Sequence, residues 1–204
     1  MSADQSQRPA SNEPEPRQTL TAAEWDFLTA AVDTLIPADE LTPSASQCGV
    51  VTFIDRQLAG AWGAGAKLYR QGPFETGKPE QGYQLPHTPR EFFAAGIAAC
   101  NAWVRQTRGR DFAELGPNDR AAALQELDAG KAALADFNGK QFFEALLQIT
   151  MEGFFSDPIY GGNRDKTGWK LVGYPGLPAD YSALIEEYRN RRYDIEPRSI
   201  GDFS

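Results

Sequence analysis

The chain has 204 residues and a mass of 22.4 kDa, a size that suits one domain. Its formal net charge of −8 at pH 7 argues against nucleic acid as a partner, because proteins that bind phosphate backbones concentrate lysine and arginine. No apolar run approaches the roughly 20 residues of a membrane-spanning helix, so we expect a soluble protein or one held at a membrane by something else.

The N-terminal residues 1–19 are rich in Ser, Gln, Pro and Glu and contain no apolar stretch, which predicts a disordered segment without a signal peptide. A helical domain is predicted to follow over residues 20–189. Its first helix starts with a capping box of Thr21 and Glu24 and a hydrophobic staple of Leu20 against Trp25, and it ends at Pro37.

Five further helices are predicted from apolar residues at helical spacing and from their start signals. Thr88 and Pro89 mark one strong start, and Pro117 marks another. The expected spans are residues 46–61, 88–107, 117–128, 138 onward, and a sixth helix from about Pro178 with Tyr181, Leu184, Ile185 and Tyr188 facing inward. The fold class is therefore mainly α: an irregular helical domain of about six helices with two long structured loops, residues 62–87 and 157–177.

The stretch 153–176 combines many glycines with many aromatic residues. Glycines permit tight turns, and Pro158 ends the preceding helix. The apolar surface of these residues is costly to leave in water, at about 25 cal/mol per Å². We therefore expect this stretch to pack on its own domain or on a partner.

No catalytic constellation is recognisable. The single histidine, His87, and the two distant cysteines, Cys48 and Cys100, cannot build the usual zinc, haem or iron–sulfur sites, and the nucleotide-binding glycine motifs are absent from the sequence. We expect no catalytic residue, cofactor or metal in this chain. The cysteines fit buried helix residues, a disulfide within the chain or a disulfide to a partner.

One segment offers an alternative. Asp157, Asn163 and Asp165 could supply oxygen ligands to a cation, although such residues between glycines more often cap turns. A free-standing enzyme or ligand-binding protein that uses the loop 157–165 is therefore a second hypothesis.

Two motifs resemble the gluconate 2-dehydrogenase subunit 3 family. The run Glu152-Gly-Phe-Phe-Ser-Asp-Pro-Ile-Tyr-Gly-Gly-Asn-Arg164, followed by Gly168-Trp-Lys170 and Gly173-Tyr-Pro-Gly176, looks like that family's signature. Leu35-Ile-Pro37 and Gly49-Val-Val-Thr-Phe-Ile-Asp55 are similar to its N-terminal half. The resemblance covers about residues 20–188.

This resemblance implies a cofactor-free small subunit of a bacterial membrane-bound dehydrogenase that oxidises a sugar or sugar acid. A large subunit would hold FAD, and a multihaem cytochrome c subunit would pass electrons on and anchor the complex. The small subunit would accompany the large one through assembly and twin-arginine export to the periplasm, at the inner membrane. The sequence departs from the family in having no twin-arginine segment before residue 20.

We therefore predict a non-catalytic accessory subunit that binds the flavoprotein. Two hypotheses stand for the aromatic residues of the loop, namely a contact with the partner or a second core of the domain itself. A chaperone that leaves after delivery is a further possibility. The C-terminal arm, residues 190–204, mixes cations with apolar residues and is expected to lie on a partner. The predicted partner-binding residues are Phe154, Phe155, Tyr160, Arg164, Asp165, Trp169, Tyr174, Arg191, Arg192 and Tyr193.

Overall fold

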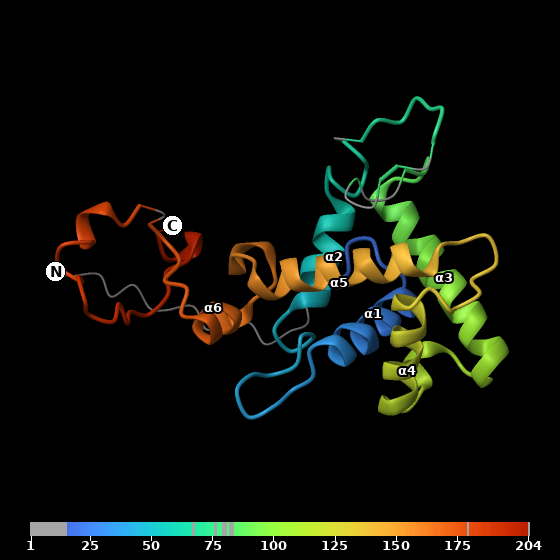
Figure 1. Ribbon diagram of the computed structural model, residues 1–204, viewed down its shortest axis with the longest axis horizontal. Helices are drawn as coiled ribbons and strands as arrows, with labels where there is room; N and C mark the ends of the chain where they lie inside the picture. The colour runs from blue at the N-terminus through green and yellow to red at the C-terminus, as the bar shows by residue number, and fades with distance from the viewer. Residues whose placement is uncertain are drawn as a thin grey trace.

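The computed structural model describes residues 16–66, 68–75, 77–78, 81, 84–178 and 180–203. Within these residues the chain forms six α-helices and no β-strand (Figure 1), which confirms the mainly α fold. Of the predicted N-terminal segment, residues 1–15 lie outside the described part. The helices are α1 (Ala22–Leu35), α2 (Val50–Ala59), α3 (Pro89–Arg108), α4 (Pro117–Asp128), α5 (Gly139–Phe155) and α6 (Thr167–Val172).

The helix ends follow their sequence signals closely. In α1 the backbone N–H of Thr21 donates to Glu24 Oε2 at 2.8 Å, and the Thr21 hydroxyl accepts from the Glu24 N–H at 3.3 Å. Thr88 and Glu91 form the same capping box at α3. The start of α2 differs from the prediction, because Gly49 has φ +85°, outside the right-handed helical region. Helix α2 therefore begins at Val50, four residues later than predicted.

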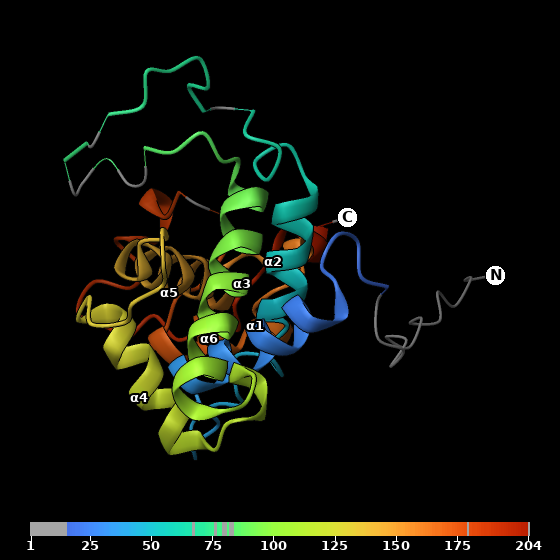
Figure 2. The ribbon, with the colours of Figure 1, turned by 90° about the vertical axis from the view of Figure 1, so that its right-hand side faces the viewer.

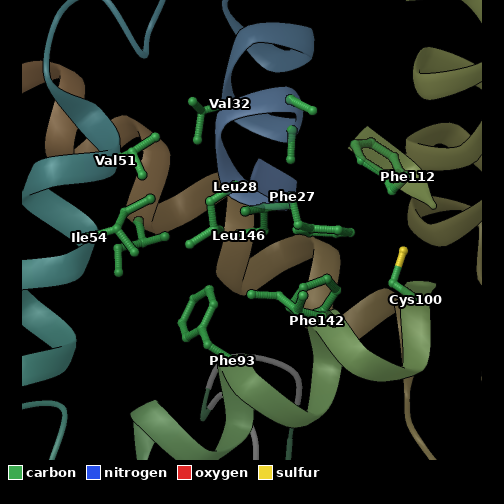
Figure 3. Close-up of a cluster of buried hydrophobic side chains, with 14 of the residues drawn as sticks. Phe27, Leu28, Val32, Val51, Ile54, Phe93, Cys100, Phe112, Phe142 and Leu146 are labelled. Atoms are coloured by element: carbon green, nitrogen blue, oxygen red, sulfur yellow. The ribbon is translucent and has the colours of Figure 1, made fainter. Parts of the chain in front are cut away.

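The core lies where α5 passes between the other long helices, and it contains residues from α1 to α5. Figure 3 shows Phe27 and Leu28 of α1 beside Phe142 and Leu146 of α5, all of them buried. Gly96 of α3 lets α3 and α5 pack closely, because a Cβ at Gly96 would lie 2.2 Å from Cδ2 of Phe142. This packing fixes the direction of α5 and hence the position of the loop that follows it.

A buried carboxylate ties the chain before α1 to α2. Asp55 is buried, and its two oxygens accept the backbone N–H groups of Gln18, Thr19 and Leu20 at 2.6, 2.9 and 2.9 Å. Three donors offset the cost of removing a charge from water. Asp55 thereby sets the path by which the chain enters α1.

The predicted sixth helix is wrong in position. Residues 182–184 form one turn of 3₁₀-helix, η5 (Ser182–Leu184), turns follow it, and Ile185 is exposed instead of facing inward. A short helix is marginal in water unless another element covers its apolar face. The sixth helix is α6, inside the segment that was predicted to be a loop.

The two long connections differ in character. In the connection between α2 and α3, the described residues 68–75 stand away from the helices (Figure 2). The segment 157–177 is instead divided among η3 (Pro158–Tyr160), η4 (Arg164–Lys166) and α6. Gly168 lets α6 pack closely against the end of α5, because a Cβ at this position would lie 2.3 Å from the Phe154 carbonyl oxygen. Gly173, with φ +68°, ends the helix in the manner of a C-terminal glycine.

Candidate partner-binding site

The residues after α5 form an ordered loop, and we call residues 156–166 the signature loop. It begins at Ser156, the C-cap of α5, and contains η3 and η4. Asp157 caps η3 by accepting the Ile159 N–H at Oδ1, at 3.0 Å. Gly161, Gly162 and Asn163 separate the two 3₁₀ turns, and α6 follows η4 directly.

Asn163 holds the signature loop together from inside. Its side chain is fully buried, its Nδ2 donates to the Ser156 carbonyl at 2.8 Å, and its Oδ1 accepts the Gly168 N–H at 2.8 Å. One amide thus joins the end of α5 to the first turn of α6. Asn163 was also predicted as an oxygen ligand to a cation, but both polar atoms of its side chain already bond backbone groups of the chain itself.

Close backbone contact explains Gly162 of this segment and Gly49 before α2. A Cβ at Gly162 would lie 2.1 Å from the Gly153 carbonyl oxygen, and a Cβ at Gly49 would lie 2.4 Å from the Gly161 oxygen. Any larger residue at either position must displace backbone. Gly49 precedes α2, so the two stretches that carry the family resemblance pack directly against each other.

Two arginines reinforce this contact between distant parts of the chain. The backbone N–H of Arg164 donates to the Cys48 carbonyl at 2.9 Å, and its side-chain Nη1 donates to the Gln47 carbonyl at 3.0 Å. From α2, Arg56 Nη1 donates to the Ile159 carbonyl at 3.2 Å. Backbone carbonyls that no helix satisfies are paired in this way. The predicted role of Arg164 in partner binding stays a prediction, and its contacts show that it also positions the loop.

The signature loop contains backbone strain. Asn163, Asp165 and Lys166 have φ values of +47°, +57° and +57°. Asn and Asp tolerate the left-handed region better than other non-glycine residues, whereas Lys pays on the order of 1 kcal/mol for it. Such conformations persist only where surrounding contacts hold them.

The aromatic residues divide into a buried and an exposed group. Phe154 and Trp169 are 2% and 6% exposed, and the Trp169 Nε1–H donates to the Phe155 carbonyl at 2.8 Å. Tyr160 and Tyr174 are 50% and 43% exposed. Trp169 and Tyr174 stack edge to face with centroids 5.1 Å apart. Phe154 thus belongs to the main core, Phe155 packs against that core, and Trp169 connects this buried support to the exposed Tyr174.

Residues from the C-terminus extend this exposed apolar surface. The element η6 (Ile200–Phe203) packs beside η3, and the Ile200 N–H donates to Asp157 Oδ2 at 2.9 Å. Ile159, Ile200 and Phe203 are all exposed. We call Ile159, Tyr160, Ile200 and Phe203 the η3–η6 surface.

The three predicted arm residues lie in a separate group. Arg191 and Arg192 are exposed, and Arg192 pairs with Asp194 at 3.5 Å on the surface. Tyr193 packs edge to face against Tyr188, with ring centroids 4.6 Å apart, and against Tyr181. The Tyr181 hydroxyl donates to the Gly176 carbonyl, which connects this tyrosine group to the end of the glycine-rich stretch 153–176.

Metal-binding geometry is not found in the described part of the chain. No group of three or more His, Cys, Asp or Glu residues there could hold a metal ion. Both carboxylate oxygens of Asp157 accept backbone N–H groups, which is turn and anchoring chemistry. None of the helices among the described residues is long and apolar enough to cross a membrane.

Both cysteines are buried and free. Burial raises the pKa of the Cys100 thiol to about 12. The pKa of Cys48 is raised as well, mainly by burial, although a hydrogen bond with Thr167 opposes the shift. The bonds of Cys48 that matter to the site come from its backbone, through the Arg164 contact.

Sequence reasoning missed the pairing of Lys166 with Asp202. The ammonium group donates to Asp202 Oδ2 at 2.7 Å and to the Pro197 carbonyl at 2.9 Å. These partners lie more than 30 residues from the lysine, so local pattern gave no signal. The role of Lys166 is visible only in the folded chain, where the C-terminal residues lie against its side chain.

Comparison with known proteins identifies the family. The family model described as "Gluconate 2-dehydrogenase subunit 3" matches residues 22–176, well over half of the chain. The comparisons with curated proteins and with solved structures gave no significant match. The match includes Gly49, the signature loop and α6, which are in contact in the structure. This chain belongs to the gluconate 2-dehydrogenase subunit 3 family.

Proposed function

We propose that this protein is a non-catalytic small subunit of a bacterial membrane-bound dehydrogenase complex of the gluconate 2-dehydrogenase type. Its role is to support the assembly, stability and export of the large subunit. That subunit carries FAD and oxidises the sugar or sugar acid, and a multihaem cytochrome c subunit accepts the electrons. The complex works in the periplasm, where the partners hold this chain at the inner membrane.

The observation that carries the proposal is an exposed aromatic surface on a rigid support, within the segment that matches the family. Tyr160 is half exposed on η3, while the buried amide of Asn163 and the Arg164 contacts fix the loop beneath it. Tyrosine at a rigid position is a favoured anchor in protein interfaces, because little side-chain entropy is lost on binding. An apolar surface of this kind fits a large protein partner better than a small polar ligand.

Within this proposal the predicted residues have two kinds of role. Tyr160, Tyr174 and Arg164 contact the large subunit. Phe154 and Phe155 at the edge of the main core, together with the buried Trp169, support them from beneath, and Asp165 sets the turn. Arg191, Arg192 and Tyr193 make a second contact through the arm.

The test is copurification with the FAD-containing large subunit after coexpression. Tyr160→Ser removes an exposed aromatic and should lower recovery of the large subunit about tenfold or more, as loss of an interface anchor does. Leu41→Ser is the matched control, because Leu41 is 77% exposed in the connection between α1 and α2 and is not one of the predicted partner-binding residues.

The outcomes separate the hypotheses. A stoichiometric complex that Tyr160→Ser weakens and Leu41→Ser leaves intact supports a structural subunit. Recovery only during synthesis of the large subunit would favour a chaperone. If the unaltered chain copurifies with no flavoprotein, the proposal is wrong.

A further inference from the structure

The last residues of the chain cross the signature loop and contact both of its ends. Near the end of the loop, Lys166 Nζ donates to the Pro197 carbonyl and to Asp202 Oδ2. Near its start, Asp157 Oδ2 accepts the Ile200 N–H at 2.9 Å. We call residues 196–203 the strap. In Figure 1 the C-terminal residues lie beside the segment that carries α6.

The strap has a defined structure of its own. Asp202 Oδ2 also accepts the Ser199 N–H at 2.6 Å, so one carboxylate oxygen closes η6 and binds Lys166. The Arg198 carbonyl accepts the Leu177 N–H at 2.8 Å, and the Arg198 N–H donates to the Pro175 carbonyl at 3.0 Å. Backbone pairing thus aligns the strap with residues 175–177, and the Lys166 ion pair fixes it to the loop.

The ion pair is placed where it can hold a strained turn. The Lys166 side chain is only 19% exposed, so water weakens this pair less than it weakens the surface pairs of the chain. Lys166 is also a residue with φ +57°, next to Asp165 with the same value. A left-handed lysine returns readily to other backbone conformations unless its side chain is held.

We propose that the strap holds the signature loop in its left-handed conformation, so that the loop and the C-terminal residues order and loosen together. The strap also supplies Ile200 and Phe203 to the η3–η6 surface, which is therefore complete only while the strap is docked. The coupling concerns the isolated chain. Its consequence for a partner rests on the proposed function.

Hydrogen–deuterium exchange of the full chain, read by mass spectrometry, tests this coupling. Lys166→Gln and Asp202→Asn each remove one side of the ion pair. In both variants, peptides covering residues 157–168 and 196–203 should exchange about tenfold faster, as expected when a charge-assisted contact that restrains local opening is lost. Peptides from α1 and α5 should not change.

Lys140→Gln is the matched control, since it removes a lysine from an exposed pair with Glu144 on α5. It should leave the loop and the strap at their original rates. Faster exchange in the strap with an unchanged loop would overturn the proposal, because the strap would then only fray. Unchanged rates in both segments, or a rise that extends to α1 and α5, would also overturn it. No partner is present, so the result does not depend on whether the dehydrogenase complex forms.

Discussion

Among single residues, Asn163 has the largest structural role in the signature loop. Its amide pairs two backbone groups that would otherwise be buried without partners, and its own backbone is left-handed. Sequence reasoning identified this residue as a turn former or an oxygen ligand. Its burial depends on the approach of α6 to the end of α5, which no local pattern encodes.

Asn163→Ala should lower the free energy of unfolding by about 2–4 kcal/mol, because it leaves the Ser156 carbonyl and the Gly168 N–H unpaired and puts a less tolerant residue at positive φ. For a domain of this size the melting temperature should fall by roughly 5–15 °C. Asn190→Ala is the control for the backbone effect, since Asn190 has φ +59° but is exposed. Equal losses in both variants would show that the buried amide contributes little.

The cysteines give a second prediction at this scale. Burial raises the pKa of both thiols and shields them from reagents, so we expect both to react slowly in the folded chain. Iodoacetamide should therefore modify neither Cys48 nor Cys100 until guanidinium chloride is added, when mass spectrometry should find both modified. Rapid modification of Cys48 in the native chain would mean that the contact between residues 47–49 and the signature loop opens readily.

At the scale of elements, the sequence predicts helices well where the start signal is local. The capping boxes at Thr21 and Thr88 place α1 and α3 within a residue or two, since both partners lie within one turn. The sequence does not predict helix α6, because Gly168 within it and Gly173 at its end resemble loop residues, and Gly168 is needed for a contact that appears only in the folded chain. The spacing of Tyr181, Leu184, Ile185 and Tyr188 predicts a helix after Pro178, but the structure has the 3₁₀ turn η5 there, and Ile185 stays exposed.

Helix α6 gives the third prediction. Trp169→Ala should destabilise the fold by about 3–5 kcal/mol, because it empties a buried site and removes the bond to the Phe155 carbonyl. Recovery of the large subunit should fall only as the folded fraction falls. Tyr160→Ser should show the reverse, with an almost unchanged melting temperature and a lower recovery. A stable Trp169→Ala variant that fails to bind would instead make Trp169 a direct contact.

The strap gives a prediction about pH. The pKa of Asp202 is lowered to about 2, first by the Lys166 ammonium group and then by the Ser199 N–H. A carboxyl whose pKa is lower in the folded chain than in the unfolded chain stabilises the fold above its ordinary pKa of about 4, and this contribution is lost as the pH falls through about 2. The chemical shift of the Asp202 carboxyl carbon should therefore stay constant from pH 7 to pH 4 and titrate only below that. Titration near pH 4 would indicate that Lys166 is not bound.

At the scale of the whole molecule, the structure confirms the mainly α fold that the sequence predicts, and it joins the start of the aromatic segment to the main core through Phe154. The sequence does not predict which distant residues contact one another at the candidate site. Cys48, Arg164 and Asp202 come from three separate parts of the chain and meet around one loop. Their contacts join backbone carbonyls to side chains of ordinary type, so composition and periodicity carry no sign of them. The family resemblance located the segment, and the packing of α5 explains its position.

Deletion of residues 190–204 tests how the C-terminal arm relates to that body. The arm pairs with residues 175–177 and Lys166, and none of its described residues, 190–203, belongs to the main core, so the circular dichroism of the helices should stay nearly unchanged. Recovery of the large subunit should fall, because the deletion removes Ile200, Phe203, Arg191, Arg192 and Tyr193 and releases the signature loop. Asp202→Asn in the full chain separates these causes, since it loosens the strap while keeping every other arm residue. Loss of the helical signal on deletion would place the arm within the fold itself, and unchanged recovery would confine the partner contact to residues before 190.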